Sequence, residues 1–381
     1  MISLFLLSFL LLVVLWNLYY STHWNKNLTV NLAFCQDFVY AGEQAELTEQ
    51  IENRKDLMLP VLEVAFHMDK KLSFHDCENT SVSDYTYKRD IFALLGNQRI
   101  TRKLTLDCNQ RGYYQINQSY LTAFSMLHRR RFSIECPADT KLYVYAARTN
   151  ISDILVSCER LMGNIQCAKR LYEDPFAFSS IREYTITDPM NTINWKASAR
   201  TGELMVNTFE STLSQKVMLY LDLEDRGILK YEHLIEESIS IAAALARKFI
   251  SRGMEVGICI NADGSIIEPA GGKRRLTDIE QLLAKCNSSD SVIPFTTLLK
   301  LPFCPQENFS YTSRNVFSSD ALKDVFHIFI SKNAIQNQTA IEQFVGNRQS
   351  AVWVIPYARG ESCDIATSDN LHLVKREVGA S

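Results

Sequence analysis

An uncharged apolar run at the N-terminus most restricts what this 381-residue chain can fold into. Residues 2–16 read ISLFLLSFLLLVVLW, and further aromatic residues follow before Lys26, the first Lys, Arg, Asp or Glu of the chain. An apolar helix of roughly 20 residues can cross a bilayer, and aromatic residues favour the interface with water. The sequence therefore predicts a transmembrane anchor in residues 1–24, with residues 2–20 inside the membrane.

The alternative to an anchor is a cleaved signal peptide. Such a peptide carries basic residues before its apolar part and small residues at its cleavage site. Neither feature is present, since the bulky residues 17–20, Asn-Leu-Tyr-Tyr, stand where small ones would be needed. Only the α-amino group precedes the apolar run, whereas Lys26 and Arg54 follow it. The positive-inside rule therefore predicts a single-pass protein of the cell membrane with cytoplasmic soluble domains.

The cysteines indicate the redox state of the compartment, and the net charge bears on the class of partner. The ten cysteines are scattered without any C-x-x-C pair, which is typical of reduced thiols. A net charge of −3 argues against nucleic-acid binding, and two short basic clusters, residues 128–131 and 273–275, are interpreted as solvated loops. The N-x-[ST] motif is short enough to arise by chance, and we give it no weight here. It begins at Asn27, Asn79, Asn117, Asn150, Asn287, Asn308 and Asn337.

Two regions of different hydrophobic pattern follow the anchor. In residues 27–150, short runs alternate between apolar and polar residues, as in Leu28, Val30 and Leu32, and polar turns separate them. Such runs predict antiparallel strands, and their spacing predicts an immunoglobulin-like β-sandwich. Residues 151–210 are predicted to be a linker with a short helix, followed by a polar segment.

From residue 211 to 360 the pattern becomes that of an α/β domain. Apolar runs of strand length alternate with amphipathic helical segments, which predicts a mostly parallel sheet covered on both faces. Because ligands bind such sheets at the carboxyl ends of the strands, we expect Asp222, Glu224 and Asp225 at the mouth of a crevice. The chain is thus predicted to be an α+β multidomain protein with a C-terminal tail over residues 361–381. The predicted strands are Lys216–Leu223, Glu255–Ile260, Asp324–Ile330 and Ala351–Ile355, and the predicted helices are residues 231–252, 276–285 and 340–345.

The segment REYTITDPMNTINWKASARTGELMV, residues 182–206, concentrates polar and aromatic side chains. In the structural interpretation, which we prefer, Trp195 is buried and Asp188 pairs with Lys196 or Arg200, so that the segment clamps the sandwich onto the α/β domain. In the functional interpretation, these residues and Asn194 present a charged groove to a partner.

The same segment carries a resemblance to a known family. IREYTITDPMNTINWKASARTGELMV, followed by VMLYLDLED, resembles the membrane-anchored bacterial family known as domain of unknown function 58. CNQRGYYQI in residues 108–116 is similar to the family's Arg-Gly-Tyr segment, and the resemblance extends from about Asn27 to Pro356. It implies a β-sandwich joined to a von Willebrand factor A-like (Rossmann-like) domain. It also implies a scaffold or adaptor, because family members commonly accompany MoxR-type AAA+ ATPases and transglutaminase-like membrane proteins.

The resemblance also raises the question of a metal site. Von Willebrand factor A domains that bind Mg²⁺ use Asp-x-Ser-x-Ser after the first strand, since a hard cation prefers carboxylate and hydroxyl oxygens. This chain has Asp-Leu-Glu-Asp-Arg in residues 222–226, with a guanidinium where the second hydroxyl should be. We therefore expect no cofactor, and Asp222 and Glu224 are the residues of a degenerate site if Mg²⁺ binds at all. The family's Gly-Asp with a following Arg is likewise replaced by Thr187-Asp188 and Asn191.

Enzyme signatures are absent from the sequence. The chain lacks G-x-S-x-G, H-E-x-x-H, a P-loop and G-x-G-x-x-G. Its seven His are scattered, and His327 in an apolar run is interpreted as a core residue. We predict a noncatalytic scaffold that binds a protein partner, with a MoxR-type ATPase as the partner that the resemblance suggests, at the edge formed by residues 222–226. The alternative is an outward-facing, metal-dependent adhesion module, which requires the opposite topology and an intact cation site.

Overall fold

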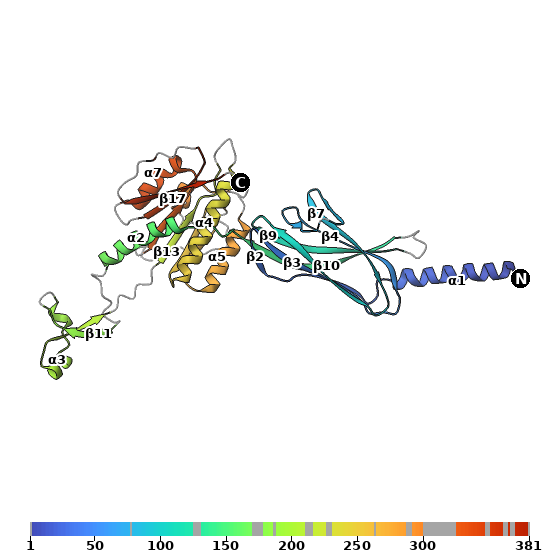
Figure 1. Cartoon of the computed structure of the whole chain (residues 1–381), viewed down its shortest axis with the longest axis horizontal. Coiled ribbons are helices and arrows are strands. Elements are labelled where there is room, and N and C mark those ends of the chain that lie inside the picture. Colours follow the sequence, from blue (N-terminus) through green and yellow to red (C-terminus); the bar gives the residue numbers. More distant parts are fainter. Residues whose placement is uncertain are drawn as a thin grey trace, which may run out of the picture. The chain divides into compact units, whose positions relative to one another are not determined.

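The chain divides into two compact units, which are described separately below (Figure 1). The first unit comprises residues 1–148 and 280–286, and the second comprises residues 149–279 and 287–381. The computed structural model describes residues 2–76, 78–124, 131–169, 178–185, 188–209, 216–225, 231–262, 264–286, 292–299, 325–346, 351–360, 365 and 370–379.

The apolar N-terminal run forms helix α1 (Ile2–His23), and its part from Leu4 to His23 is long and apolar enough to cross a membrane. Side chains along most of the helix are exposed, as a bilayer would require, but the helix does not end in a free linker. Tyr20 and Trp24 are buried in an apolar cluster of the first unit together with strand residues such as Leu62. The C-terminal end of α1 is therefore packed into the sandwich that follows it.

The first unit contains two sheets that pack together as a sandwich. The four-stranded sheet has the order β1-β3-β8-β5, and the six-stranded sheet has the order β2-β10-β9-β4-β7-β6. All described pairs are antiparallel except β2 with β10. The predicted β-sandwich is therefore confirmed. Its strands are β1 (Leu28–Phe34), β2 (Phe38–Tyr40), β3 (Glu43–Asn53), β4 (Leu59–Asp69), β5 (Ser73–Phe74), β6 (Thr80–Val82), β7 (Tyr85–Leu94), β8 (Arg99–Cys108), β9 (Gly112–Phe124) and β10 (Arg131–Tyr145).

Four charged side chains lie between two apolar clusters inside the sandwich. On β3, Leu47 belongs to one cluster and Ile51 to the other, and the inward position between them is Glu49. Lys88 and Asp90 of β7 are also buried, and the ion pair from Arg102 to Asp90 is 3.1 Å long. We call Glu49, Lys88, Asp90 and Arg102 the charged layer.

The charged layer leaves one carboxylate without hydrogen-bond donors. Both Oε atoms of Glu49 are buried and have no hydrogen-bond partner among the described residues. Burial and then the charge of Asp90 raise the pKa of Glu49 to about 7, although Arg102 and Lys88 act in the opposite direction. Asp90 is better satisfied, because Asn79 donates to it at 3.2 Å. A cavity of about 860 Å³ reaches Lys88, Asp90 and Arg102 but is not lined by Glu49.

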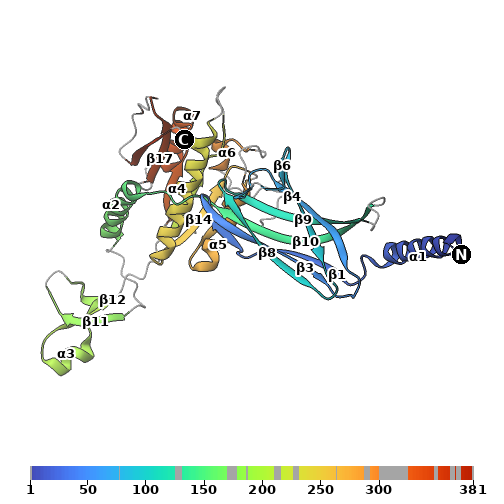
Figure 2. The ribbon, with the colours of Figure 1, turned by 45° about the vertical axis from the view of Figure 1, so that its right-hand side comes forward.

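The second unit is built on a six-stranded sheet with helices on both faces (Figure 2). Its order is β15-β14-β13-β16-β17-β18, and all neighbours are parallel except β14 with β15. Helices α4 and α2 contact the sheet through β13, β14, β17 and β18, while α6 and α7 share an apolar cluster with Met218 and Tyr220. The strands are β13 (Lys216–Leu221), β14 (Glu255–Ile260), β15 (Ile266–Ala270), β16 (Val325–Ile330), β17 (Ala351–Ala358) and β18 (Leu371–Val378). The helices are α2 (Ser152–Lys169), α4 (Glu232–Ser251), α6 (Phe295–Leu298) and α7 (Ala334–Val345). Helix α5 (Lys273–Lys285) begins in the second unit, and its residues from Glu280 onward belong to the first unit.

Several features of the second unit differ from the sequence predictions, and residues 273–275, expected in a solvated loop, form the first turn of α5. The expected short helix in the linker is α2, which spans 18 residues and contacts β17 and β18 because Ile154 and Cys158 on it are buried. Helix α7 begins at Ala334, six residues earlier than expected. Strand β15 was not predicted, and the expected C-terminal tail contains β18, which pairs with β17. Basic residues 128–130 lie outside the described residues.

Candidate functional site

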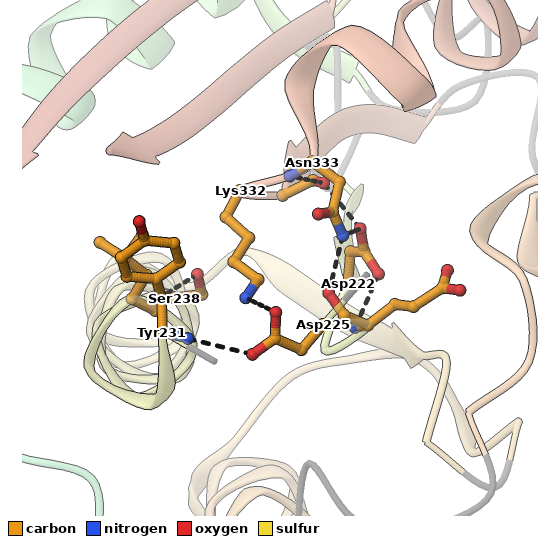
Figure 3. Close-up of polar contacts among 9 residues, drawn as sticks. Asp222, Asp225, Tyr231, Ser238, Lys332 and Asn333 are labelled. Carbon is orange, nitrogen blue, oxygen red and sulfur yellow. Dashed lines mark hydrogen bonds and ion pairs between the residues drawn. The ribbon is translucent and has the colours of Figure 1, made fainter. Parts of the chain in front are cut away.

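The carboxyl ends of β13 and β16 form the first candidate site (Figure 3). Numbered along the chain, the strand order is 3-2-1-4-5-6, so β13 and β16 flank the point where the order reverses. Open α/β sheets bind ligands at this switch point. Asp222 follows β13, Ser331 and Asn333 follow β16, and Asn261 follows β14, so that four polar residues meet at one edge of the sheet.

Asp222 is the centre of this cluster and accepts five hydrogen bonds. Its Oδ1 accepts from Asn261 Nδ2 at 2.7 Å and from the backbone N–H of Glu224 at 3.0 Å. Its Oδ2 accepts from Ser331 Oγ at 2.7 Å, from Asn337 Nδ2 at 2.8 Å and from Asn333 Nδ2 at 3.1 Å. Five donors around one carboxylate match its ionised form, which can only accept hydrogen bonds.

The electrostatics of Asp222 reflect two opposing effects. The side chain is 1% exposed, and burial raises the pKa of this carboxyl above its usual range. Hydrogen bonds from Ser331, from the Glu224 backbone and from Asn333 lower the pKa and oppose that effect. Since the neighbours donate to Asp222, the cluster holds a buried negative charge with amide and hydroxyl dipoles instead of with a cation.

A buried ion pair lies beside Asp222. Lys332 Nζ is 2.6 Å from Asp225 Oδ1, and both side chains are almost fully buried. Asp225 also accepts from the backbone N–H of Tyr231 at 3.1 Å, at the start of α4 (Figure 3). The ammonium of Lys332 is thus paired with Asp225, the third carboxylate of residues 222–226.

The geometry of this edge is poorly suited to a metal ion. Among the described residues, no three His, Cys, Asp or Glu side chains are grouped so that they could hold one. The Nδ2 atoms of Asn261, Asn333 and Asn337 face Asp222, and a cation there would require their oxygens instead. Glu224 directs its backbone N–H to Asp222, and Arg226 lies outside the described residues. The sequence identified Asp222 but missed the amides that surround it.

The polar segment of the sequence forms a small module within the second unit, which we call the hairpin module. It consists of strands β11 (Phe178–Glu183) and β12 (Met205–Phe209), a short 3-10 helix (Met190–Thr192) and helix α3 (Trp195–Thr201). Asn194 is the N-cap of α3, because its Oδ1 accepts from the N–H of Ala197 at 3.0 Å. Gly202 ends the helix with a φ of 81°, a conformation that glycine adopts without strain.

Asp188 holds the hairpin module together. Its two oxygens accept from Arg182 at 2.6 and 2.7 Å, and Thr185 donates to it through its backbone N–H and its hydroxyl. These bonds, above all the one from Arg182, hold the pKa of Asp188 well below its usual range. The expected pairing of Asp188 with Lys196 or Arg200 is wrong, since Arg182 is its partner within the described residues.

The preferred interpretation of Trp195 is also wrong. Its side chain is 69% exposed, and Lys196 and Arg200 are exposed too. Trp195 is the first residue of α3, and the module is too small to cover an indole ring from that position. Asp188 and Asn194 thus stabilise the module, whereas Trp195, Lys196 and Arg200 are available on its surface.

Replacing Asp188 with alanine should loosen the hairpin module without unfolding the rest of the chain. The change removes the acceptor shared by Arg182 and Thr185, so we expect faster proteolysis within residues 178–209. Because the folded pKa is depressed, this stabilisation is present above the usual pKa of 3.8 and is lost as the pH falls towards the folded value. The control is Glu203→Ala at an exposed position of the same module. Equal cleavage of both variants at neutral pH would contradict the assignment.

Two other predicted features have structural roles. His327 is half-buried in β16, its Nδ1 lies 3.2 Å from the Tyr220 hydroxyl, and burial lowers its pKa to about 4, which agrees with the interpretation of a structural histidine. Arg111 of the Arg-Gly-Tyr segment donates to the backbone oxygens of Leu283 and, at 2.6 Å, of Cys286. It thereby satisfies carbonyl groups at the C-terminal end of α5, which have no partner within the helix.

Comparisons with known proteins cover only parts of the chain. No curated protein matches it. The CARDB domain of the PF1109 protein from Pyrococcus furiosus is 14% identical, covers 30% of this chain and 86% of its own, and has a TM-score of 0.19. A non-cellulosomal cohesin from Archaeoglobus fulgidus is 9% identical, covers 34% of this chain and 97% of its own, and has a TM-score of 0.22. Likenesses this low carry no conclusion about function. Residues 180–294 match the family model described as "Protein of unknown function DUF58", which supports the resemblance to that family over this part of the chain.

Proposed function

We propose that this protein is a noncatalytic, membrane-tethered scaffold or adaptor that binds a protein partner. In this proposal α1 is a single-pass anchor and the two soluble units lie on the cytoplasmic side. The partner class suggested by the family resemblance is a MoxR-type AAA+ ATPase. The hairpin module is the surface that binds it, in place of the edge formed by residues 222–226, where Asp222 is buried among internal donors.

The second unit is, in this proposal, a von Willebrand factor A-like domain without a working cation site. The strand order 3-2-1-4-5-6 is that of a doubly wound α/β fold and supports this classification. The donors around Asp222 disfavour the alternative of a metal-dependent adhesion module, because each would have to be displaced or turned before a cation could bind.

The observation that carries the proposal is the division of roles within the hairpin module. Asp188 and Asn194 direct their polar atoms to groups of the module itself. Trp195 is exposed, and so is Met190 on the neighbouring 3-10 helix. Exposed large apolar side chains beside cations are typical of protein-binding surfaces, and tryptophan is enriched among the residues that dominate binding energy. A surface of this kind binds a partner without performing chemistry.

Trp195→Ala should weaken partner binding at least about tenfold, because a binding hot spot contributes roughly 2 kcal/mol or more. The measurement is the affinity of the full chain in nanodiscs for a purified MoxR-type AAA+ ATPase from the same organism. The control is Ile335→Ala, which removes an 80% exposed apolar side chain from α7. Both variants should keep the wild-type melting temperature. Undiminished binding by Trp195→Ala overturns the binding surface, and no binding by the wild type overturns the choice of partner.

A further inference from the structure

The end of the sandwich at which α1 enters contains two loops that form one rigid surface. Loop 54–58 joins β3 to β4, and loop 95–98 joins β7 to β8; we call them the anchor-side loops. Buried Asn53 links them, because its Nδ2 donates to the carbonyl oxygens of Leu57 at 3.0 Å and Leu95 at 2.8 Å. Gly96 approaches the Asp56 backbone so closely that a Cβ would lie 2.6 Å from its carbonyl oxygen. This surface therefore has a fixed shape.

The anchor-side loops are bonded to the end of the anchor helix. Lys55 Nζ donates to the carbonyl oxygens of Trp24 and, at 3.0 Å, Lys26. The backbone N–H of Arg54 donates to Asn27 at 2.9 Å. Since Trp24 is itself buried in the sandwich, the helix and both loops form one body.

A small cavity shows which part of α1 lies beside loop 54–58. This cavity, of about 490 Å³, is lined by Asp56 and Leu57 of one loop and by Leu12, Leu15, Trp16 and Tyr19 of the helix. The loop thus lies beside the last turns of α1 that are still exposed, not beyond the end of the helix.

The exposed length of the helix leaves no room for a spacer between the bilayer and the sandwich. Residues 2–19 precede the buried Tyr20, and at ~1.5 Å per residue they span about 27 Å. The hydrocarbon core of a bilayer is roughly 30 Å thick. If α1 crosses the membrane, the anchor-side loops, which lie beside its last exposed turns, must therefore lie at the headgroup level or at its boundary with the acyl chains.

The exposed side chains at this end of the sandwich suit contact with an anionic lipid surface. Leu95 is 64% exposed, and Met58 of the other loop is exposed as well. Arg54 and Arg99 share the single carboxylate Glu52, at 2.8 Å each, and with Lys55 and Asp56 of the loop also counted, these five side chains carry a net charge of +1. Arg131 begins β10 at the same end of the sandwich, opposite Phe124. An interface with anionic headgroups favours exposed apolar side chains that are surrounded by cations. Each cation near the surface contributes about 1 kcal/mol of binding free energy.

We propose that the anchor-side loops dock onto the anionic lipid surface around the anchor. Leu95 and Met58 enter the boundary between headgroups and acyl chains, and Arg54, Arg99 and Arg131 bind lipid phosphates. This second membrane contact rests on the membrane anchoring stated under the proposed function. It fixes the sandwich on the bilayer and does not depend on the hairpin module.

Photocrosslinking to lipid tests the docking. The full chain carries the photoreactive residue benzoylphenylalanine at position 95, or at position 10 in the anchor, or at position 82. Val82 matches Leu95 in exposure, at 68%, but pairs with Thr86 near the far end of β7, about 26 Å from Leu94 at ~3.3 Å per residue. In vesicles of phosphatidylcholine and phosphatidylglycerol, we expect lipid adducts at positions 10 and 95, each several-fold above position 82.

The possible results test the docking of the anchor-side loops separately from the membrane anchoring by α1. Adducts at position 10 but not at position 95 would leave the anchor in place and overturn the docking. No adduct at position 10 would overturn the anchoring and, with it, this proposal. The double variant Arg54→Glu, Arg131→Glu should reduce the adduct at position 95 several-fold in these vesicles and much less in phosphatidylcholine alone, while circular dichroism stays unchanged. An equal yield at position 95 in both lipids with the wild-type cations would overturn the binding of anionic headgroups.

Discussion

Replacing Asp222 with alanine is expected to destabilise the second unit by about 3–5 kcal/mol. The change removes the acceptor of five hydrogen bonds and leaves the buried donors of Asn261, Ser331 and Asn337 facing an empty space. Water at the exposed rim cannot replace the carboxylate, because these side chains are almost fully buried. The measurement is the free energy of unfolding in urea, followed by hydrogen–deuterium exchange of the amides of β13 and β16. It gives the loss of stability of this sheet alone.

The same experiment distinguishes a carboxylate held by hydrogen-bond donors from a carboxylate that binds a metal ion. Asp278→Ala, at an exposed position, is the control and should change the free energy of unfolding by less than about 0.5 kcal/mol. EDTA or Mg²⁺ should leave the unfolding of the wild-type sheet unchanged, since a bound cation would add RT ln(1 + [L]/Kd) to its stability. A rise in stability with Mg²⁺ that disappears in Asp222→Ala would contradict our interpretation of the site.

Replacing Glu49 with glutamine should stabilise the sandwich at pH 8 by up to about 3 kcal/mol and change little at pH 4. Glu49 ionises near 4.5 when exposed to water and near 7 in the folded chain, because burial and Asp90 disfavour its charge. Between these values the folded state binds a proton that the unfolded state has lost. The stability of the wild-type sandwich therefore falls as the pH rises from about 4.5 to about 7, and glutamine removes that dependence.

A neighbouring glutamate provides the matched control for this change. Glu46 lies on the same strand but points outward and pairs with Lys103 at 3.0 Å. Glu46→Gln should not stabilise the sandwich at either pH. Unfolding in urea at pH 4 and pH 8, followed by hydrogen exchange in β3 and β7, compares the variants. A lower stability of Glu49→Gln at pH 8 would mean that the ionised carboxylate is paired favourably.

The fold could be predicted where burial follows a local pattern. Alternating apolar residues gave the sandwich strands, and near-continuous apolar runs gave β13, β14, β16 and β17, because a strand buried on both faces has apolar residues at every position. Strand β18 was missed because its sequence, LHLVKREV, contains charged residues that suit the edge of a sheet.

The candidate sites were harder to predict because their partners are distant in the sequence. Asn337 lies 115 residues from Asp222, and no periodicity links the two. Glu49, in contrast, could have been found, because continuing the alternation of Leu47 and Ile51 places it inside the sandwich. Trp195 was assigned to the core from its residue type alone, yet it begins a seven-residue helix in a module with few residues to cover it.

The burial of the C-terminal end of α1 has a mechanical consequence. Tyr20 and Trp24 fix the last turn of α1 in the sandwich, and Lys55 binds the carbonyl groups that follow it, so no hinge separates the helix from the first unit. Helices that are too long for a bilayer tilt within it, and those in thicker bilayers stand more upright. If α1 crosses a membrane, as proposed, any such tilt of α1 becomes a tilt of the sandwich by the same angle. The thickness of the membrane would therefore set the direction in which the first unit points.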